Sequence, residues 1–337
     1  MVSSTLSFLV LITATTLAAA VPHSRLASRA STCTTKSQRK SWTTLTNTEK
    51  AAYIEAELCL MNSPTKGFVA DAVSRWDDLT WAHLNQSNYI HDVGQFLPWH
   101  RYFMYTHEYL LKTECNYTGT QPYWDEEADS DALVDSDVFD PDTGFGGNGV
   151  SSNTSDYACI ADGPFVNVTL AMGPEYTNTN HCIYREFSAT SFMWANSTYL
   201  DQCMAEENYT SAYPCFSSWP HTSGHAGVGG SMLDIVASPG EPLFFLHHTN
   251  LDRLWWIWQS KNLTTRLTDM GGQNIPDDDY LASMGMPYPD ASLTNYSGDP
   301  GNVTTLTHVL WMSGLVPNVT VGDVMDIGGD LLCFEYV

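Results

Sequence analysis

Histidines are the residues of this chain whose type and spacing best suit chemistry. Most of the eleven fall into two clusters, His83, His91 and His100 in the first, and His221, His225, His247 and His248 in the second. His221 and His225 are four residues apart, so on a helix both imidazoles project from one face and can bind one metal ion. A third histidine can come from a neighbouring helix. The spacing therefore predicts two sites of three histidines each.

The donor set indicates which metal these sites hold. Three neutral imidazoles, without a Cys or carboxylate at ligand spacing, suit copper or zinc better than calcium or magnesium. Zinc hydrolases of the His-Glu-x-x-His type need a Glu after the first histidine, where this chain has Thr222. Di-iron carboxylate proteins need Glu-x-x-His pairs, which the sequence lacks. Two copper sites are the preferred interpretation, and a zinc hydrolase is an alternative.

Residues near the second cluster are candidates to support its ligands. Adjacent helical residues point about 100° apart, so we expect His248 to face the metal and His247 to lie behind it. Asp252, four residues after His248, is expected to orient a ligand, and Phe244 to pack against a ligand ring. The isolated histidines are expected to have no role at the metals, namely His23, His181 and His308, and His107 is not expected to be a ligand.

Five helices are expected to position these residues. Capping signals and apolar periodicity predict helices over residues 46–60, 66–85, 96–112, 223–236 and 242–260. Residues 129–180 are rich in Gly, Asp, Ser and Asn and should be mostly loop, held by disulfides. Residues 331–336 fit a short final strand.

Length and composition restrict the class of protein. The chain has 337 residues, 43% of them hydrophobic, which is enough to bury the core of one large helical domain. Asp and Glu number 38 against 14 Lys and Arg, a formal net charge of -24. Such a surface repels phosphates and anionic headgroups, so we do not expect the chain to bind nucleic acids or membranes through a basic patch. The expected partner is a small molecule; the oligomeric state is left open.

The N-terminal region predicts export. Residues 1–20 fit a signal peptide and residues 21–40 a leader or N-terminal arm, and no apolar run is long enough for a transmembrane helix. Eight cysteines in an oxidising compartment predict disulfides, whose pairing the sequence does not reveal. Glycosylation sequons agree with export; they start at Asn85, Asn116, Asn153, Asn167, Asn196, Asn208, Asn262, Asn295, Asn302 and Asn318.

Three motifs give the chain a family resemblance. The segment 91–101 ending Phe-Leu-Pro-Trp-His-Arg, the sequence Pro-Tyr-Trp-Asp at 122–125, and the segment 242–253 beginning Pro-Leu-Phe-Phe-Leu-His-His resemble the copper signatures of the tyrosinase and catechol oxidase family, and of its short secreted fungal members. The resemblance implies a mainly α fold: a central four-helix bundle holding a dicopper centre, with long disulfide-tied loops and few short strands. It also implies one catalytic domain over residues 41–337 without a C-terminal shielding domain.

The resemblance also assigns residues. His83, His91 and His100 would hold the first copper ion, and His221, His225 and His248 the second. Asp125, in the Pro-Tyr-Trp-Asp motif, would have a structural role near the site. Ala226, after the second histidine of the second cluster, would leave room for bulky rings in the substrate pocket.

Departures from the family pattern concern three positions. Glu241 stands where the family commonly has Asp, and we expect only a shifted hydrogen bond. Tyr89 stands where many relatives have a cysteine joined to a histidine, so that crosslink is not expected. Thr222 stands where monophenol-hydroxylating relatives often have Asn, and no carboxylate lies in the dozen residues before His221.

The functional expectation is therefore a secreted copper oxidase that uses O2 to oxidise o-diphenols, with o-aminophenols as further candidates, to quinones. The alternatives are a tyrosinase that also hydroxylates monophenols and a haemocyanin-like O2 carrier.

Overall fold

A computed structural model describes Met1 and residues 33–152 and 155–337. The expected signal peptide, most of the expected leader, His23 and the sequon at Asn153 lie outside the described residues. The folded unit runs from Cys33 to Val337.

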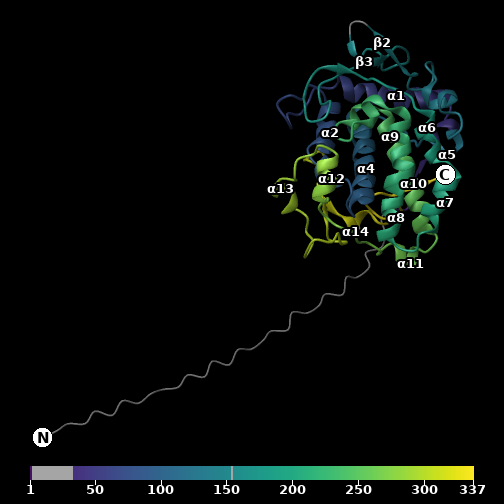
Figure 1. Ribbon diagram of the computed structural model, residues 1–337. Helices are drawn as coiled ribbons and strands as arrows, with labels where there is room; N and C mark the ends of the chain where they lie inside the picture. Colours follow the sequence, from purple (N-terminus) through teal and green to yellow (C-terminus); the bar gives the residue numbers. More distant parts are fainter. Residues whose placement is uncertain (2–32, 153–154) are drawn as a thin grey trace. The chain divides into compact units, whose positions relative to one another are not determined.

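Four histidine-bearing helices form the centre of this unit, as Figure 1 shows: α2 (Arg75–Leu84), α4 (Phe96–Glu114), α9 (Thr222–Val228) and α10 (Leu243–Ser260). α4 packs against α10, and α1 (Asn47–Asn62) packs against α2 and α4. Burying large apolar side chains between these helices is the main stabilising contribution, and Trp76, Trp99 and Trp255 are almost fully buried there. The expected mainly α fold with a central four-helix bundle is confirmed.

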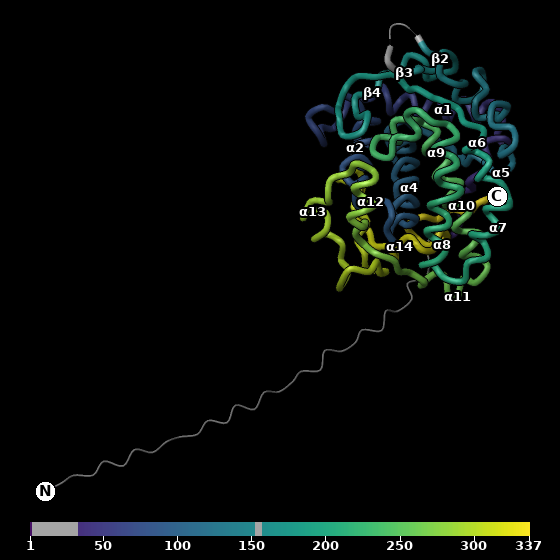
Figure 2. Tube along the Cα trace, viewed as in Figure 1, coloured from purple at the N-terminus to yellow at the C-terminus, as the bar shows by residue number. Residues whose placement is uncertain are grey.

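Short helices and strand pairs surround the bundle (Figure 2). The helices are α3 (Ser87–Ile90), α5 (Glu126–Asp129), α6 (Ala189–Phe192), α7 (Ser197–Ala205), α8 (Tyr209–Phe216), α11 (Leu263–Arg266), α12 (Asp278–Ser283), α13 (Ala291–Thr294) and α14 (Val321–Val324). The strands pair in twos: β1 (Ser37–Arg39) with β8 (Phe334–Tyr336), β2 (Gly149–Ser152) with β3 (Ser155–Ile160), β4 (Thr169–Leu170) with β5 (His181–Cys182), and β6 (Val309–Leu310) with β7 (Val319–Thr320). No helix among the described residues is both long and apolar enough to cross a membrane.

Two expected helix boundaries were wrong, and local backbone chemistry explains both. The helix expected over 66–85 begins at Arg75, because a capping box fixes its start. In this box the Asp77 amide donates a hydrogen bond to the Ser74 hydroxyl, and the Ser74 amide donates one to the Asp77 carboxylate. The helix expected over 223–236 ends at Val228, because Gly229 and Gly230 follow with φ of 66° and 54°. The expected helix at 46–60 is confirmed as α1, with its own capping box between Thr46 and Glu49.

All eight cysteines form disulfides: Cys33–Cys333, Cys59–Cys115, Cys159–Cys182 and Cys203–Cys215. The Cys159–Cys182 bond ties together the long segment that the sequence predicts as loop. The Cys33–Cys333 bond joins residues 300 positions apart, next to the parallel pair β1–β8. Residues 33–40, expected as part of a leader or arm, therefore lie within the folded unit.

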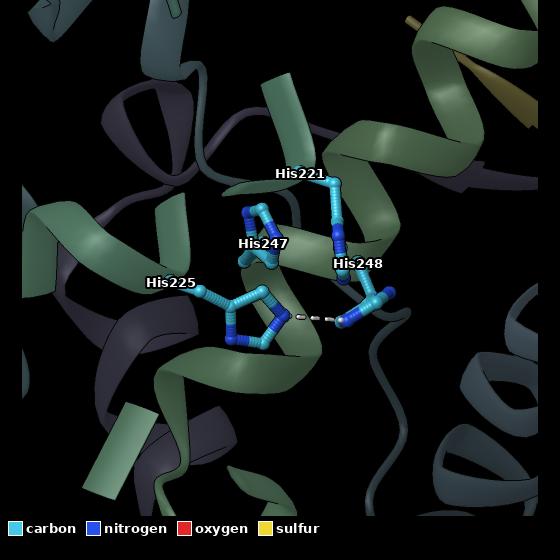
Figure 3. A group of neighbouring side chains, drawn as sticks. All are labelled: His221, His225, His247 and His248. Atoms are coloured by element: carbon cyan, nitrogen blue, oxygen red, sulfur yellow. Dashed lines mark hydrogen bonds between the residues drawn. The ribbon is translucent and has the colours of Figure 1, made fainter. Parts of the chain in front are cut away.

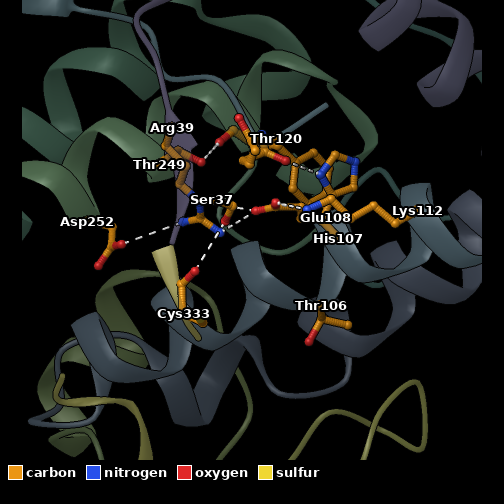
Figure 4. Close-up of polar contacts among 12 residues, drawn as sticks. Ser37, Arg39, Thr106, His107, Glu108, Lys112, Thr120, Thr249, Asp252 and Cys333 are labelled. Atoms are coloured by element: carbon orange, nitrogen blue, oxygen red, sulfur yellow. Dashed lines mark hydrogen bonds and ion pairs between the residues drawn. The ribbon is translucent and has the colours of Figure 1, made fainter. Parts of the chain in front are cut away.

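Arg39 ties β1 to the bundle (Figure 4). Its buried guanidinium donates to the Glu108 carboxylate at 2.8 Å, lies 3.8 Å from the Asp252 carboxylate, and stacks 3.7 Å from the Phe334 ring centre. Burial by itself would raise the pKa of Glu108, but the charges of Arg39 and Lys112 outweigh it and lower that pKa. The N-terminal strand is thus fixed to α4 and α10 through charged groups.

Candidate metal centre

The structure brings the predicted histidines together in two groups. His83, His91 and His100 form one group, and His221, His225, His247 and His248 form the other. Each histidine offers one ring nitrogen, and within each group these nitrogens all lie within 4.8 Å of one another. His83 comes from α2, His100 from α4 and His225 from α9, so the bundle itself sets their positions.

Backbone hydrogen bonds orient most of the rings in the same way. The Nδ1 atoms of His83, His91 and His100 lie 2.9, 2.8 and 2.8 Å from the carbonyl oxygens of residues 236, 87 and 96. His221 and His225 make the same contact, at 3.1 and 2.5 Å. Because a carbonyl oxygen only accepts, Nδ1 must carry the proton, and Nε2 keeps its lone pair for a metal.

The environment keeps these imidazoles neutral. Burial disfavours the imidazolium ion and lowers the pKa of His91 to about 4. Burial, together with repulsion between neighbouring histidines, lowers the pKa of His100 and of His248 well below the usual value. His83, His221 and His225 shift in the same direction, with burial as the main cause of the lowered pKa. Neutral imidazole is the form that binds metals.

The two groups face each other across the bundle. The rings of His100 and His248, one from each group, stack with their centres 4.4 Å apart. Phe96 packs 4.7 Å from the His100 ring and 4.8 Å from the His221 ring. Phe244 lies 4.2 Å from the His248 ring, in the position that the sequence predicts. Aromatic side chains thus pack around the space between the two histidine groups.

The residues present fit a pair of metal ions. The Nε2 atoms of His83, His100 and His221 are buried and have no hydrogen-bond partner. A buried polar atom is normally satisfied, so unpartnered lone pairs that converge on one space suit cations placed between them. The donors are all imidazoles, a set that copper and zinc accept.

His247 lies closer to the second group than its helical position predicts. Figure 3 shows its ring beside those of His221 and His225. The centre of the His247 ring lies 4.7 Å from the centre of the His225 ring. Its Nδ1 lies 2.5 Å from the Glu126 carboxylate, whereas His248 Nε2 lies 3.2 Å from His225 Nε2. His247 therefore adjoins the candidate ligands, and its expected place behind the metal stays a prediction. The contact with Glu126 distinguishes it from His248.

Two carboxylates expected near the ligands contact arginines instead. Asp252 pairs with Arg101 and accepts a 2.5 Å hydrogen bond from the Tyr336 hydroxyl. Asp125 is partly exposed and lies 3.9 Å from Arg253. The expectation that Asp252 orients a ligand histidine was wrong: it instead connects α10 to Arg101 on α4 and to Tyr336 on β8.

Glu241 and three further histidines of the described chain have structural partners. Glu241 is fully buried, binds Arg185 through both oxygens, and accepts the amide of Leu243 at the start of α10. His107 stacks 3.7 Å from Phe245, and His308 Nδ1 lies 2.6 Å from the Asp299 carboxylate. His181 contacts the carbonyl oxygen of Thr179. None of these three histidines belongs to a metal-binding group of the described chain.

A cavity of about 210 Å³ opens beside the second histidine group. Its walls are mostly apolar and comprise His91, His221, Thr222, His225, Leu233, Ile235, Ser238 and Met284. Thr222 lines it as expected, whereas Ala226, the other expected pocket residue, is not part of the lining. Leu233, Ile235, Ser238 and Met284 were missed, as was Glu126. Glu126 directly follows the Pro-Tyr-Trp-Asp motif, but no spacing in the sequence marks the other four.

Comparisons with known proteins agree with this geometry. Residues 73–261 match the model of the common central domain of tyrosinase. A tyrosinase-like protein of Diaporthe leptostromiformis is 31% identical, over 90% of this chain and 80% of its own length. An N-acetyl-6-hydroxytryptophan oxidase of Emericella nidulans is 28% identical, over 89% and 92%. The structure of a single-site mutant of a polyphenol oxidase from Thermothelomyces thermophila superposes with a TM-score of 0.74 at 27% identity, covering 90% of this chain and 89% of that one.

With its histidine-bearing bundle and these relatives, the chain belongs to the tyrosinase family, which implies a dinuclear copper centre.

Proposed function

We propose that this protein is a secreted dicopper polyphenol oxidase that uses O2 to oxidise o-diphenols to o-quinones. His83, His91 and His100 would hold one copper ion, and His221, His225 and His248 the other. The observation that carries the proposal is the convergence of unpartnered, buried Nε2 atoms from both groups beside a largely apolar cavity.

The reaction balances with two metals. When bound, a copper pair supplies two one-electron acceptors and a site for reducing O2. Each o-diphenol loses two electrons and two protons to become a quinone. Two diphenols therefore supply the four electrons and four protons that convert one O2 into two water molecules.

The side chains of the cavity would bind and orient the phenolic ring. Leu233, Ile235 and Met284 offer apolar surface that displaces water from the ring faces. The backbone bonds to Nδ1 hold the histidine rings in place, and Phe244 packs against His248, so the ligands need not reorganise when substrate enters. Each of these roles positions the substrate or the ligands.

The surroundings of Thr222 favour diphenols over monophenols. Hydroxylating a monophenol requires a base that takes the phenol proton before reaction. The Thr222 hydroxyl donates to the carbonyl oxygen of Ser217 at 3.2 Å, and no carboxylate lines the cavity within the described chain. An o-diphenol or o-aminophenol, which is oxidised without ring hydroxylation, does not need that base.

Oxygen uptake by the copper-loaded protein tests the proposal. We expect rapid uptake with 4-methylcatechol and little or none with the matching monophenol, p-cresol. A p-cresol rate comparable to the catechol rate would establish a tyrosinase instead. Reversible O2 binding without oxidation of any catechol would establish an O2 carrier.

Metal analysis provides the control for the ligand assignment. We expect two copper ions per chain, and one in His225→Ala, with an unchanged far-ultraviolet circular dichroism spectrum because the four disulfides are untouched. His181→Ala, outside both groups, should keep two copper ions. A single zinc ion per chain would overturn the copper assignment and favour a hydrolase.

Export is part of the proposal. Residues 1–20 would act as a signal peptide, and any leader removed after them must end before Cys33, because Cys33 is bonded to Cys333. Four disulfides support folding in an oxidising compartment. N-terminal sequencing of the protein recovered from culture medium tests this, and a mature chain starting beyond residue 33 would contradict it.

A further inference from the structure

A groove adjoins the cavity beside the histidines. It has a volume of about 440 Å³ and shares Leu233, Ile235 and Met284 with the cavity, so the two spaces adjoin. The rest of its lining comes from four stretches of the chain: residues 174–176, Tyr184, the group Gly230, Asp234 and Val236, and Gly285 after α12. The cavity alone is smaller than the roughly 300–1,000 Å³ of typical ligand pockets, whereas the groove adds room for a substituent.

The lining of the groove carries negative charge. Glu175 and Asp234 line it, and neither the groove nor the inner cavity is lined by a Lys or Arg. The Asp234 carboxylate accepts the amides of Glu175, Val236 and Ala237, at 2.6, 2.9 and 3.2 Å, so it shapes the groove. Glu175 is exposed and pairs with no cation of the described chain. Its charge is therefore available to a ligand.

Aromatic rings accompany this charge. Tyr176 and Tyr184 line the groove, and Tyr157 stacks 4.6 Å from the Tyr184 ring. Ring faces and carboxylates both attract ammonium groups and repel carboxylates. The lining thus matches an amine better than an acid.

The inner cavity holds an unsatisfied hydroxyl. Ser238 is 1% exposed, lines the cavity, and its hydroxyl has no hydrogen-bond partner. Buried hydroxyls are normally paired, so a ring that carries its own hydroxyl groups is the kind of ligand that would satisfy it. A ligand with a hydroxylated ring in the cavity can then extend its substituent into the groove.

We propose that the groove binds the substituent of the substrate and selects a protonated amine, so that aminoalkyl-substituted o-diphenols are preferred over carboxyalkyl-substituted ones. This inference rests on the proposed o-diphenol oxidase function. It goes further by naming Glu175 as a residue that determines substrate specificity.

The test compares three catechols with the copper-loaded protein. These are 3,4-dihydroxyphenethylamine, 3-(3,4-dihydroxyphenyl)propanoic acid and uncharged 4-methylcatechol. We expect kcat/KM to be higher for the amine than for the acid by about two- to fivefold for each exposed charge that contributes, and the ratio to shrink as salt is added.

Variants test whether the charge of Glu175 causes this preference. Glu175→Gln should lower the amine-to-acid ratio, and Glu175→Lys, which offsets the remaining charge of Asp234, should lower it further. Glu55→Gln, the same substitution at an exposed position of α1 outside the groove, should leave the ratio unchanged. Equal ratios in all four proteins would overturn the inference while 4-methylcatechol turnover still supported the oxidase.

Failure of the proposed function is distinguishable. If none of the three catechols is oxidised, the same amine-to-acid ratio is measured as dissociation constants by isothermal titration calorimetry. A ratio that responds to Glu175→Lys supports the groove assignment without catalysis, and a ratio that does not respond overturns it.

Discussion

Replacing Asp252 distinguishes a structural role of this carboxylate from a role at the metals. Asp252 is 3% exposed and pairs with Arg101, which also donates to Gln259 Oε1 and to the carbonyl oxygens of Val324 and Met325. It also accepts from the Tyr336 hydroxyl. Asp252→Ala would leave Arg101 buried with its charge uncompensated.

The expected loss of stability is large. Removing one partner of a buried ion pair costs about 3–5 kcal/mol, against a total unfolding free energy of roughly 5–15 kcal/mol for a domain. Asp252→Asn keeps the shape and one acceptor oxygen and should cost less, about 1.5–3 kcal/mol, the range for hydrogen bonds to charged groups. The double variant Asp252→Ala with Arg101→Met should recover part of the loss, because no unpaired charge is left.

The assay is equilibrium urea unfolding of the metal-free protein with disulfides intact, followed by tryptophan fluorescence. Copper binding to the folded variants is titrated separately. We expect the unfolding free energy to fall while the folded variants still bind two copper ions. A loss below about 1 kcal/mol for Asp252→Ala, well under the range for a broken buried pair, or weakened copper binding at unchanged stability, would refute the structural assignment and restore the ligand-orienting role.

Three further predictions concern the stability of the folded unit. Burial raises the pKa of Glu57 well above its usual value, so the folded chain keeps a proton that the unfolded chain releases above about pH 4.3. As pH rises from there towards the pKa of the folded chain, the stability that this proton contributes is lost by about 1.4 kcal/mol per pH unit. Glu57→Gln should flatten this decline in urea unfolding measured upward from about pH 4.3, and an unchanged slope would contradict it. Replacing Cys33 and Cys333 by Ser should lower the unfolding free energy by about 2–5 kcal/mol, since the bond joins residues 300 positions apart, and an unchanged urea midpoint would exclude this. Gly224→Ala should lower both the melting temperature and the copper content, because its Cβ would lie 2.2 Å from His247 Nδ1, whereas full copper loading would show that the ring can move away.

Local patterns predicted the elements whose determinants lie within one or two helical turns. The capping box at Thr46 and the apolar faces of residues 96–112 and 242–260 each gave a helix close to its observed bounds. The closeness of His221 and His225 was predicted for the same reason, because residues i and i+4 of a helix lie on one face. The helix start at Arg75 was missed although Ser74 and Asp77 carry a local signal, since the apolar residues before them resemble a continuing helix.

Contacts between distant residues could not be predicted in this way. Asp252 has helical spacing from His248, yet its partners Arg101 and Tyr336 are 151 and 84 residues away. Glu126 reaches His247 across 121 residues, and the disulfide pairings depend on the complete fold. The groove beside the cavity is built from segments distant in sequence that only the fold brings together. Such arrangements depend on tertiary packing, about which periodicity carries no information.

The pairing of β1 with β8 has a consequence for the order in which the protein is built. Arg39 and Tyr336 are 297 residues apart, and both contact Asp252 on the helix that bears His248. During synthesis β1 has no partner until residue 336 has emerged, so this contact forms only after 297 further residues have been translated. Contacts of such high sequence separation form slowly because a long loop must close first. The support of the histidine-bearing helices is therefore completed late, and we expect copper to be taken up only after residue 336 is available to pair with β1.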